Sequence, residues 1–171
     1  DANAISRHVF SVLDAIGFDQ GAAHTEIRIT REGPMLVEVN ARLVGAFIPR
    51  LLSASLGHSV HDDLIDLHRG EDVLARLEQG PRRFASTRWM VAGCEGRLEA
   101  IDLPGIDAAQ VAGVEILRRA GEPVRLPQEN ADRLGYVITV GDTADQAEDR
   151  AEAFVAAARV RVVPEAVAGA A

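Results

Sequence analysis

Two short runs of alternating side chains, separated by a turn, constrain the fold of this chain more than any other feature. Residues 23–30 (Ala-His-Thr-Glu-Ile-Arg-Ile-Thr) alternate, residues 31–34 contain Gly and Pro, and residues 35–40 (Met-Leu-Val-Glu-Val-Asn) form a second run. A period of two residues is typical of a strand, and a short Gly-containing loop between two such runs indicates a hairpin. The sequence therefore predicts an antiparallel β-hairpin over residues 23–40.

The alternation also sorts the side chains of the hairpin onto two faces. The apolar face is expected to hold four β-branched residues: Ile27, Ile29, Val37 and Val39. The polar face is expected to hold the remaining alternating positions: His24, Glu26, Arg28, Leu36, Glu38 and Asn40. If Thr30 pairs with Pro34 around a three-residue loop, Glu26 lies directly opposite Glu38.

This polar face is a candidate metal site. Two carboxylates opposite each other destabilise a sheet, and a cation removes the conflict. Mg²⁺ prefers carboxylate and amide oxygens, which Glu26, Glu38 and Asn40 supply. Arg42 follows on the same side if the strand continues, where a guanidinium could stabilise charge on a transferring phosphoryl group. A solvated hairpin face explains the same pattern, and His24 either orients a carboxylate, touches substrate or is structural.

The rest of the chain predicts an α+β fold in two layers, with helices covering small antiparallel sheets. Helical spacing with caps and terminal glycines predicts helices over residues 3–16, 46–56, 59–69, 71–78, 106–112 and 143–159, the last capped by Thr143 or Asp142. Alternating or apolar runs predict strands over residues 83–92, 96–102, 113–119 and 134–140. The breaker Gln79-Gly80-Pro81 divides the chain into domains 1–80 and 81–171, and the tail from Glu165 is expected to fray.

Charge and composition exclude several classes of partner. The net charge of −8 disfavours nucleic acid and anionic membranes. No apolar run approaches the roughly 18 residues of a membrane helix, and the N-terminus resembles no signal peptide. The single Cys94 is expected to be a buried thiol, compatible with the cytoplasm. Because the chain begins directly in a helical pattern without Met, we expect it to be a piece of a longer protein.

The hairpin sequence resembles the end of the ATP-grasp domain of carboxylate–amine ligases, in particular the L-amino-acid ligases and biotin-carboxylase-like enzymes. The resemblance rests on Gly21-Ala22-Ala23-His24-Thr25-Glu26-Ile27 and on Gly33-Pro34-Met35-Leu36-Val37-Glu38-Val39-Asn40-Ala41-Arg42. It implies that Glu26, Glu38 and Asn40 bind Mg²⁺, or Mn²⁺, that bridges the ATP phosphates. It also implies that Arg42 contacts the γ-phosphate or an acyl-phosphate.

The form of the motif narrows the resemblance. His-Thr-Glu at 24–26 is closest to the amino-acid ligases, whereas biotin-dependent carboxylation is less favoured. The family usually has Pro where this chain has Ala41, a mild change, and Gly45 fits the family's glycine-containing loop beside the ligated substrate. The resemblance continues through residues 46–69 and through residues 132–143 with the helix that follows. It therefore implies the C-terminal part of an ATP-grasp domain followed by a small α+β subdomain.

In this family, an upstream lobe with Lys residues and a Gly-rich loop binds ATP. This chain has no such loop before Glu26 and no Lys, since all its Lys-type and Arg-type positions are Arg. The chain alone is therefore expected to be inactive and to bind ATP weakly. The implied function is ATP-dependent ligation through an acyl-phosphate, with ATP, a small carboxylate and an amine such as amino acids as partners, and a homodimer as a further expected assembly. The alternative is a non-catalytic binding or dimerisation module that retains the scaffold.

A second candidate metal site is formed by His58, His61 and His68, whose spacing on one predicted helix can hold a transition metal. Scattered surface or capping histidines explain the same pattern. Asp62 and Asp63 in the first turn are explained by the helix dipole, which favours acidic side chains there.

Overall fold

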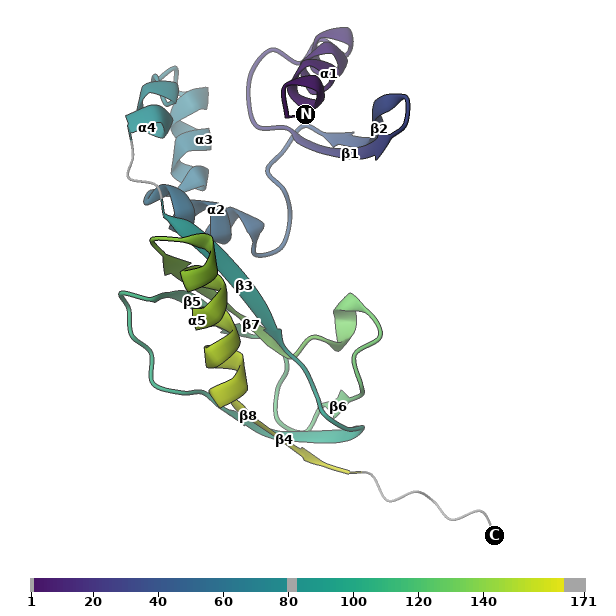
Figure 1. The fold of residues 1–171 in the computed structure, drawn as a ribbon, viewed down its shortest axis with the longest axis vertical. Helices are drawn as coiled ribbons and strands as arrows, with labels where there is room; N and C mark the ends of the chain where they lie inside the picture. Colours follow the sequence, from purple (N-terminus) through teal and green to yellow (C-terminus); the bar gives the residue numbers. More distant parts are fainter. Residues whose placement is uncertain (1, 80–82, 165–171) are drawn as a thin grey trace. The chain divides into compact units, whose positions relative to one another are not determined.

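The computed structural model describes residues 2–79 and 83–164 (Figure 1). The chain forms two compact units, Asp1–Pro49 with Ser59–Gly80, and Arg50–His58 with Pro81–Ala171. It combines runs of helices with antiparallel sheets, which confirms the predicted α+β class. The centre of the predicted breaker, at 80–82, and the predicted frayed tail from Glu165 lie outside the described residues. The domain assignment at residue 80 remains a prediction.

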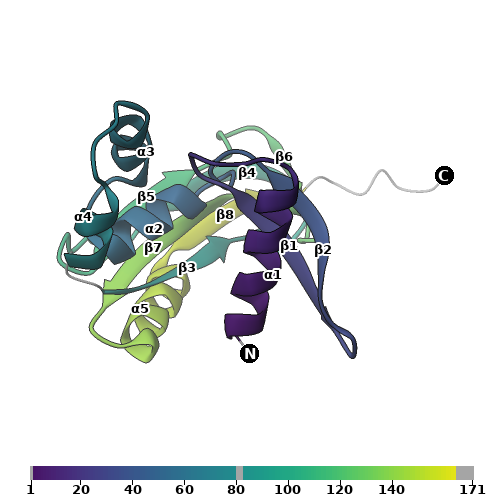
Figure 2. The same ribbon diagram turned by 90° about the horizontal axis from the view of Figure 1, so that it is seen from above.

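The first unit is built around the predicted hairpin. Its elements are α1 (Ala2–Ala15), β1 (His24–Thr30), β2 (Gly33–Asn40), α3 (Val60–His68) and α4 (Leu74–Gln79). The strands β1 and β2 pair antiparallel, and α1 contacts β2 (Figure 2). After α1, the chain turns at Gly17, whose φ of 72° is a conformation that glycine adopts without strain. No residue of α1, β1 or β2 is fully buried, so the hairpin and α1 have a thin core, and the buried residues of this unit include Val60 and Val73.

The second unit contains two antiparallel three-stranded sheets. Its elements are α2 (Ile48–Leu56, in this unit from Arg50), β3 (Phe84–Met90), β4 (Gly96–Asp102), β5 (Val111–Ile116), β6 (Pro123–Val124), the 3₁₀ helix η1 (Asn130–Asp132), β7 (Gly135–Gly141), α5 (Ala144–Ala157) and β8 (Arg159–Val163). The strand orders are β3-β7-β5 and β6-β4-β8. No helix in the described ranges is long and apolar enough to cross a membrane.

One part of the core of the second unit lies where α5 packs on the β3-β7-β5 sheet (Figure 1), and a second buried cluster contains Met90, Leu98 and Leu134. All seven residues of β7 are buried. The helix contributes Ala147, Ala151 and Phe154, and the small alanines let the helix approach closely. The buried hydroxyl of Thr139 donates to the carbonyl oxygen of Ala147 at 2.6 Å. Thr143 caps α5 as predicted, since its side chain accepts from the amide of Gln146.

Three local predictions were wrong. Residues 106–110 form a loop with a turn instead of a helix, because the Asp107 carboxylate accepts from the amide of Ala109 and from the side chain of Gln110, and strand β5 begins at Val111. The last helix ends at Ala157, and the residues after it form the unpredicted strand β8. Cys94 is exposed, because it lies in the surface turn between β3 and β4.

Candidate functional site

The two carboxylates of the predicted site lie opposite each other in the hairpin. Glu26 pairs with Glu38, and His24 pairs with Asn40 two residue pairs further along the ladder. Directly opposed residues of an antiparallel pair project from the same face of the sheet. The register predicted for Glu26 and Glu38 is therefore confirmed.

A β-bulge produces this register by a route that the sequence did not predict. Thr30 pairs with Gly33, so the turn has two residues and a regular ladder would place Val37 opposite Glu26. The register shifts between Glu26 and Ile27, which leaves Val37 as the extra residue of β2. Leu36 then pairs with Ile27, so the prediction that Leu36 shares the polar face, with Val37 on the apolar face, was wrong. The bulge returns Glu38 to the face of Glu26.

The polar face joins these side chains by short contacts. The Asn40 side-chain amide donates to Glu38 Oε1 at 2.9 Å. The Nε2 atom of His24 lies 3.9 Å from Oε1 of Glu26. The His24 side chain is 25% exposed, whereas that of Glu26 is 51% exposed and Glu38 is also exposed. The carboxylates thus face solvent, with the imidazole and the amide at their flanks.

Arg42 follows the strand but does not extend the ladder. The strand β2 ends at Asn40, and the amide of Arg42 donates back to the Asn40 carbonyl oxygen at 2.9 Å. Its guanidinium is exposed and donates to the carbonyl oxygen of Leu43 at 2.9 Å. Arg42 was expected on the polar face only if the strand continued, and the strand does not continue. Arg42 lies beside the site on a bend.

The loop after Arg42 contains backbone strain. Among the described residues, Ala46 is the one non-glycine residue with positive φ, at 56°. A side chain in this left-handed conformation costs roughly 1–2 kcal/mol. Gly45, which the resemblance placed in this loop, does not adopt positive φ. Such strain concentrates at functional sites, which motivates a functional hypothesis for this loop.

The oxygen donors fit a hard divalent cation. Glu26 and Glu38 offer two carboxylates, and because the NH₂ group of Asn40 donates to Glu38, its Oδ1 is left as the atom that could bind a cation. Across residues 2–79 and 83–164, no group of three or more His, Cys, Asp or Glu side chains could hold a metal ion, which removes the His58, His61 and His68 alternative there. Two carboxylates and an amide leave coordination positions for water or phosphate oxygens, as Mg²⁺ sites usually do.

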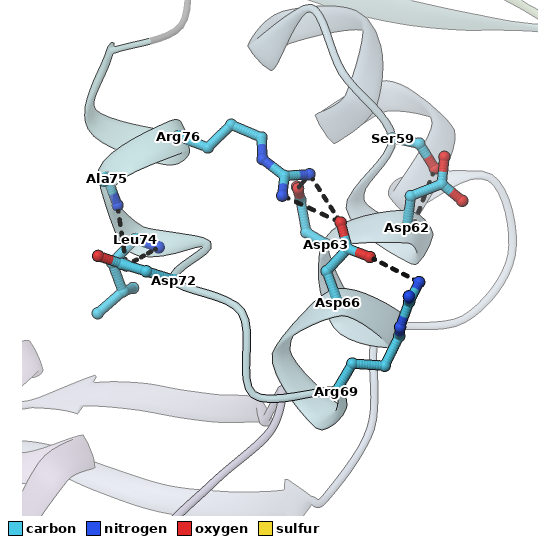
Figure 3. A network of polar contacts seen from close by, with 9 residues as sticks. All are labelled: Ser59, Asp62, Asp63, Asp66, Arg69, Asp72, Leu74, Ala75 and Arg76. Atoms are coloured by element: carbon cyan, nitrogen blue, oxygen red, sulfur yellow. Dashed lines mark hydrogen bonds and ion pairs between the residues drawn. The ribbon is translucent and has the colours of Figure 1, made fainter.

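Two acidic side chains of α3, those of Asp63 and Asp66, are already engaged with arginines (Figure 3). The Arg76 guanidinium contacts Asp63 at 3.2 Å and Asp66 at 3.0 Å, and so links α3 to α4. Arg69 lies 3.8 Å from Asp66. The hydroxyl of Ser59 caps the helix by accepting from the amide of Asp62. These contacts agree with a structural explanation of the acidic turn.

A cavity of about 320 Å³ in the second unit offers little to a ligand. Its charged lining residues are joined to neighbouring groups: Arg125 to Asp132 at 2.6 Å, and Arg118 to the carbonyl oxygen of Ala131. The main-chain amide of Gln128 and the Arg125 guanidinium lower the pKa of Asp132 from 3.8 to about 2. The charges around this cavity therefore stabilise the loop that carries η1.

A polar cluster that the sequence did not predict attaches α2 to the sheet of the second unit. Arg50 contacts Glu115 at 2.7 Å, and the hydroxyl of Tyr136 donates to the same carboxylate at 2.6 Å. Burial raises the pKa of Tyr136. Trp89 packs edge-to-face on Tyr136 with ring centroids 5.5 Å apart, and the Arg133 guanidinium lies 3.9 Å from the Trp89 ring. No single signal in the sequence marks this cluster, because its members come from four separate segments.

Comparison with known proteins identifies the fold. The family model described as "L-amino acid ligase C-terminal domain 2" matches residues 88–163. The structure superimposes on phosphoribosylglycinamide synthetase from Anaerococcus prevotii with a TM-score of 0.81 at 14% identity, over 95% of this chain and 43% of that chain. It superimposes on L-amino acid ligase from Bacillus licheniformis with a TM-score of 0.71 at 21% identity, over 95% of this chain and 41% of that chain. The chain has the fold of the C-terminal part of an ATP-grasp ligase. The resemblance stated from the sequence is confirmed.

A third ATP-grasp structure was solved with ligands. The biotin carboxylase domain of Hydrogenobacter thermophilus 2-oxoglutarate carboxylase was solved with ADP, its magnesium salt and bicarbonate. It matches with a TM-score of 0.61 at 16% identity, over 90% of this chain and 34% of that chain. At this identity the likeness supports the fold alone.

Two curated proteins are similar to this chain in sequence. Dapdiamide A synthase of Enterobacter agglomerans is 28% identical over 149 residues, which are 82% of this chain and 34% of the relative. The uncharacterized protein y4rH of Sinorhizobium fredii is 34% identical over 140 residues, which are 80% of this chain and 28% of the relative. The chain thus spans about a third or less of the length of these relatives and is related to ATP-dependent ligases.

Proposed function

We propose that these 171 residues are the C-terminal part of an Mg²⁺- and ATP-dependent carboxylate–amine ligase that acts through an acyl-phosphate. The supporting observation is the opposed pair Glu26 and Glu38, with Asn40 bonded to Glu38, on a hairpin of ATP-grasp fold. Like-charged carboxylates at one ladder step disfavour the hairpin on its own, so the arrangement is explained by a cation.

The roles of the residues follow from their chemistry. Glu26, Glu38 and the amide oxygen of Asn40 would hold Mg²⁺, which when bound supplies charge neutralisation for the ATP phosphates. Arg42, exposed beside them, is proposed to meet the charge that develops on the transferring phosphoryl group. Its present bond to the Leu43 carbonyl is a single neutral acceptor, so a phosphate oxygen competes with it readily.

The proposed reaction has two steps. A carboxylate oxygen of the first substrate attacks the γ-phosphorus and forms a C–O–P bond while ADP leaves. The amine of the second substrate then attacks the carbonyl carbon and loses a proton, and phosphate leaves with the original carboxylate oxygen. Amino acids are the proposed substrate class, because the related proteins include an L-amino acid ligase and dapdiamide A synthase.

An isotope experiment on the complete protein that contains these residues tests the proposal. Amino-acid pairs are supplied with ATP and Mg²⁺, and the first carboxylate is labelled with ¹⁸O. The proposal expects ADP release that depends on both substrates, and one ¹⁸O atom in the released phosphate. Formation of AMP and pyrophosphate would contradict the acyl-phosphate, and no ADP release with any amino-acid pair would favour the non-catalytic module.

Two variants connect this activity to the hairpin. Glu38→Gln removes one negative charge from the proposed cation site, so higher Mg²⁺ should partly restore the rate. Glu32→Gln, in the turn between β1 and β2, is a matched control outside the site. Equal Mg²⁺ dependence in the two variants would show that Glu38 does not bind the cation.

A further inference from the structure

His24 occupies an unusual position for a structural histidine. Its side chain is three-quarters covered, and its Nδ1 atom is buried without a hydrogen-bond partner among the described residues. A buried polar atom without a partner carries a desolvation cost and calls for an explanation. An apolar side chain would fill the same position without that cost.

The other ring nitrogen of His24 points to the explanation. Nε2 lies 3.9 Å from Glu26 Oε1, outside hydrogen-bond distance but within reach after a rotation of the exposed Glu26 side chain. On the neighbouring strand, the amide of Asn40, which pairs with His24, already donates to Glu38. The two carboxylates are thus flanked by one nitrogen donor each. The flanking donors lie opposite each other in the ladder.

We propose that His24 is a positioning residue for the cation site, which donates from Nε2 to Glu26 and fixes the orientation of that carboxylate. This inference rests on the proposed function, since it requires Glu26 to bind a divalent cation. Hydrogen-bond partners behind the ligands hold them in the binding geometry, and their removal typically weakens metal binding about 10–100-fold. His24 then does for Glu26 what the Asn40 amide does for Glu38.

A pair of substitutions of equal size tests this role. His24→Gln keeps a nitrogen donor at about the reach of Nε2, whereas His24→Met has nearly the same length and no donor. Thr25→Val is the control on the same strand: Thr25 pairs with Val39 on the other face, and its hydroxyl is buried without a partner in the described structure. Circular dichroism checks that each variant folds, and His24→Leu replaces the Met variant if that one does not.

Mn²⁺ is titrated into the complete protein that contains these residues, and the broadening of the backbone amide signals of residues 24–40 gives its affinity without any enzyme turnover. We expect His24→Met to weaken Mn²⁺ binding about tenfold or more. His24→Gln and Thr25→Val should stay within about threefold of the unaltered chain, while Glu38→Gln should lose binding strongly.

The outcomes separate the two proposals. If the Gln and Met variants bind Mn²⁺ equally, or if the Met variant binds like the unaltered chain, the proposed role of His24 is wrong. The cation site itself is still supported in that case, provided that Glu38→Gln weakens Mn²⁺ binding. If the unaltered chain shows no selective broadening of the hairpin, or Glu38→Gln changes nothing, the cation site itself fails and the role of His24 with it.

Discussion

The hairpin β1–β2 and the strand β7 use similar residues in opposite ways. Every residue of β7 is buried between its neighbours and α5, whereas no residue of the hairpin is fully buried. Ile138 in β7 is 1% exposed, but Ile29 in β1 is 63% exposed. A hairpin free of a tight core can hold two like charges at one ladder step. The proposed cation site therefore lies on the hairpin, outside the densely packed core of the second unit.

The largest expected effect compares these two isoleucines. Ile138→Ala should lower the free energy of unfolding by about 2–5 kcal/mol, because it leaves a cavity in a packed core. Ile29→Ala should lower it by less than about 1 kcal/mol, because the side chain already meets solvent. Urea unfolding followed by far-UV circular dichroism measures both. Similar costs at the two positions would show that the hairpin is as well packed as β7.

Arg42→Ala should affect turnover and leave stability unchanged. Loss of one preorganised donor to developing charge costs about 10²–10³ in kcat, or roughly 3–4 kcal/mol, with a smaller rise in KM. Arg42→Lys should restore the rate only in part, since Lys lacks the planar fork. Steady-state kinetics of the complete protein measure these values. A folded Arg42→Ala variant with near-normal kcat would show that Arg42 is a solvated surface arginine without a role in turnover.

Two single-residue deletions test the bulge. Deleting Val37 removes the extra residue and keeps Glu26 opposite Glu38, so Mn²⁺ affinity should stay within about threefold. Deleting Val39 moves Asn40 onto the opposite face and should weaken Mn²⁺ binding at least about tenfold, or roughly 1.4 kcal/mol. Nuclear magnetic resonance titration compares them. The reverse order of affinities would mean that Val37 is not the extra residue.

Ala46→Gly should stabilise the first unit by up to about 1 kcal/mol. Glycine removes the strain of the left-handed conformation, although part of this gain is offset by the greater freedom of glycine in the unfolded chain. Ala41→Gly, in the same segment and without positive φ, is the control and should not stabilise. Thermal unfolding measures the difference. A destabilised Ala46→Gly variant would show that the loop is held by contacts of the Ala46 methyl group.

The smallest expected effect is on the stability of the second unit at acidic pH. The pKa of Asp132 is about 2 in the folded chain and 3.8 ordinarily, so its contribution to stability is present above about pH 4 and is lost as pH falls toward 2. Asp132→Asn should therefore make the loss of stability between pH 4 and 2 less steep. Urea unfolding at several pH values measures the slope. An unchanged slope would contradict the role of the Asp132 carboxylate.

The sequence predicted the hairpin and its opposed carboxylates because side chains alternate between the two faces even of a short strand. It could not predict the bulge, since Leu36 and Val37 are adjacent apolar residues and either one can be the extra residue. The three-residue loop and the bulge each add one residue, so an incorrect turn led to the correct pairing of Glu26 with Glu38.

Other errors have different causes. The strand β8 was missed because Arg159–Val163 alternates directly after an alanine-rich helix, with no Gly or Pro between them. The cluster of Arg50, Glu115 and Tyr136 depends on contacts between distant segments, which periodicity does not encode. The roles assigned to Glu26, Glu38, Asn40 and Arg42 remain predictions.

The edge-to-face pair of Trp89 and Tyr136 has an optical consequence. The chain has one Trp and one Tyr, and both lie in the second unit. Intrinsic fluorescence and near-ultraviolet absorbance therefore report on the second unit and do not respond directly to the hairpin. If the first unit opens at a lower temperature, the emission spectrum will stay nearly constant while the far-ultraviolet signal falls. A tryptophan introduced at Phe10 of α1, which is 65% exposed, would make the first unit visible in the same measurement.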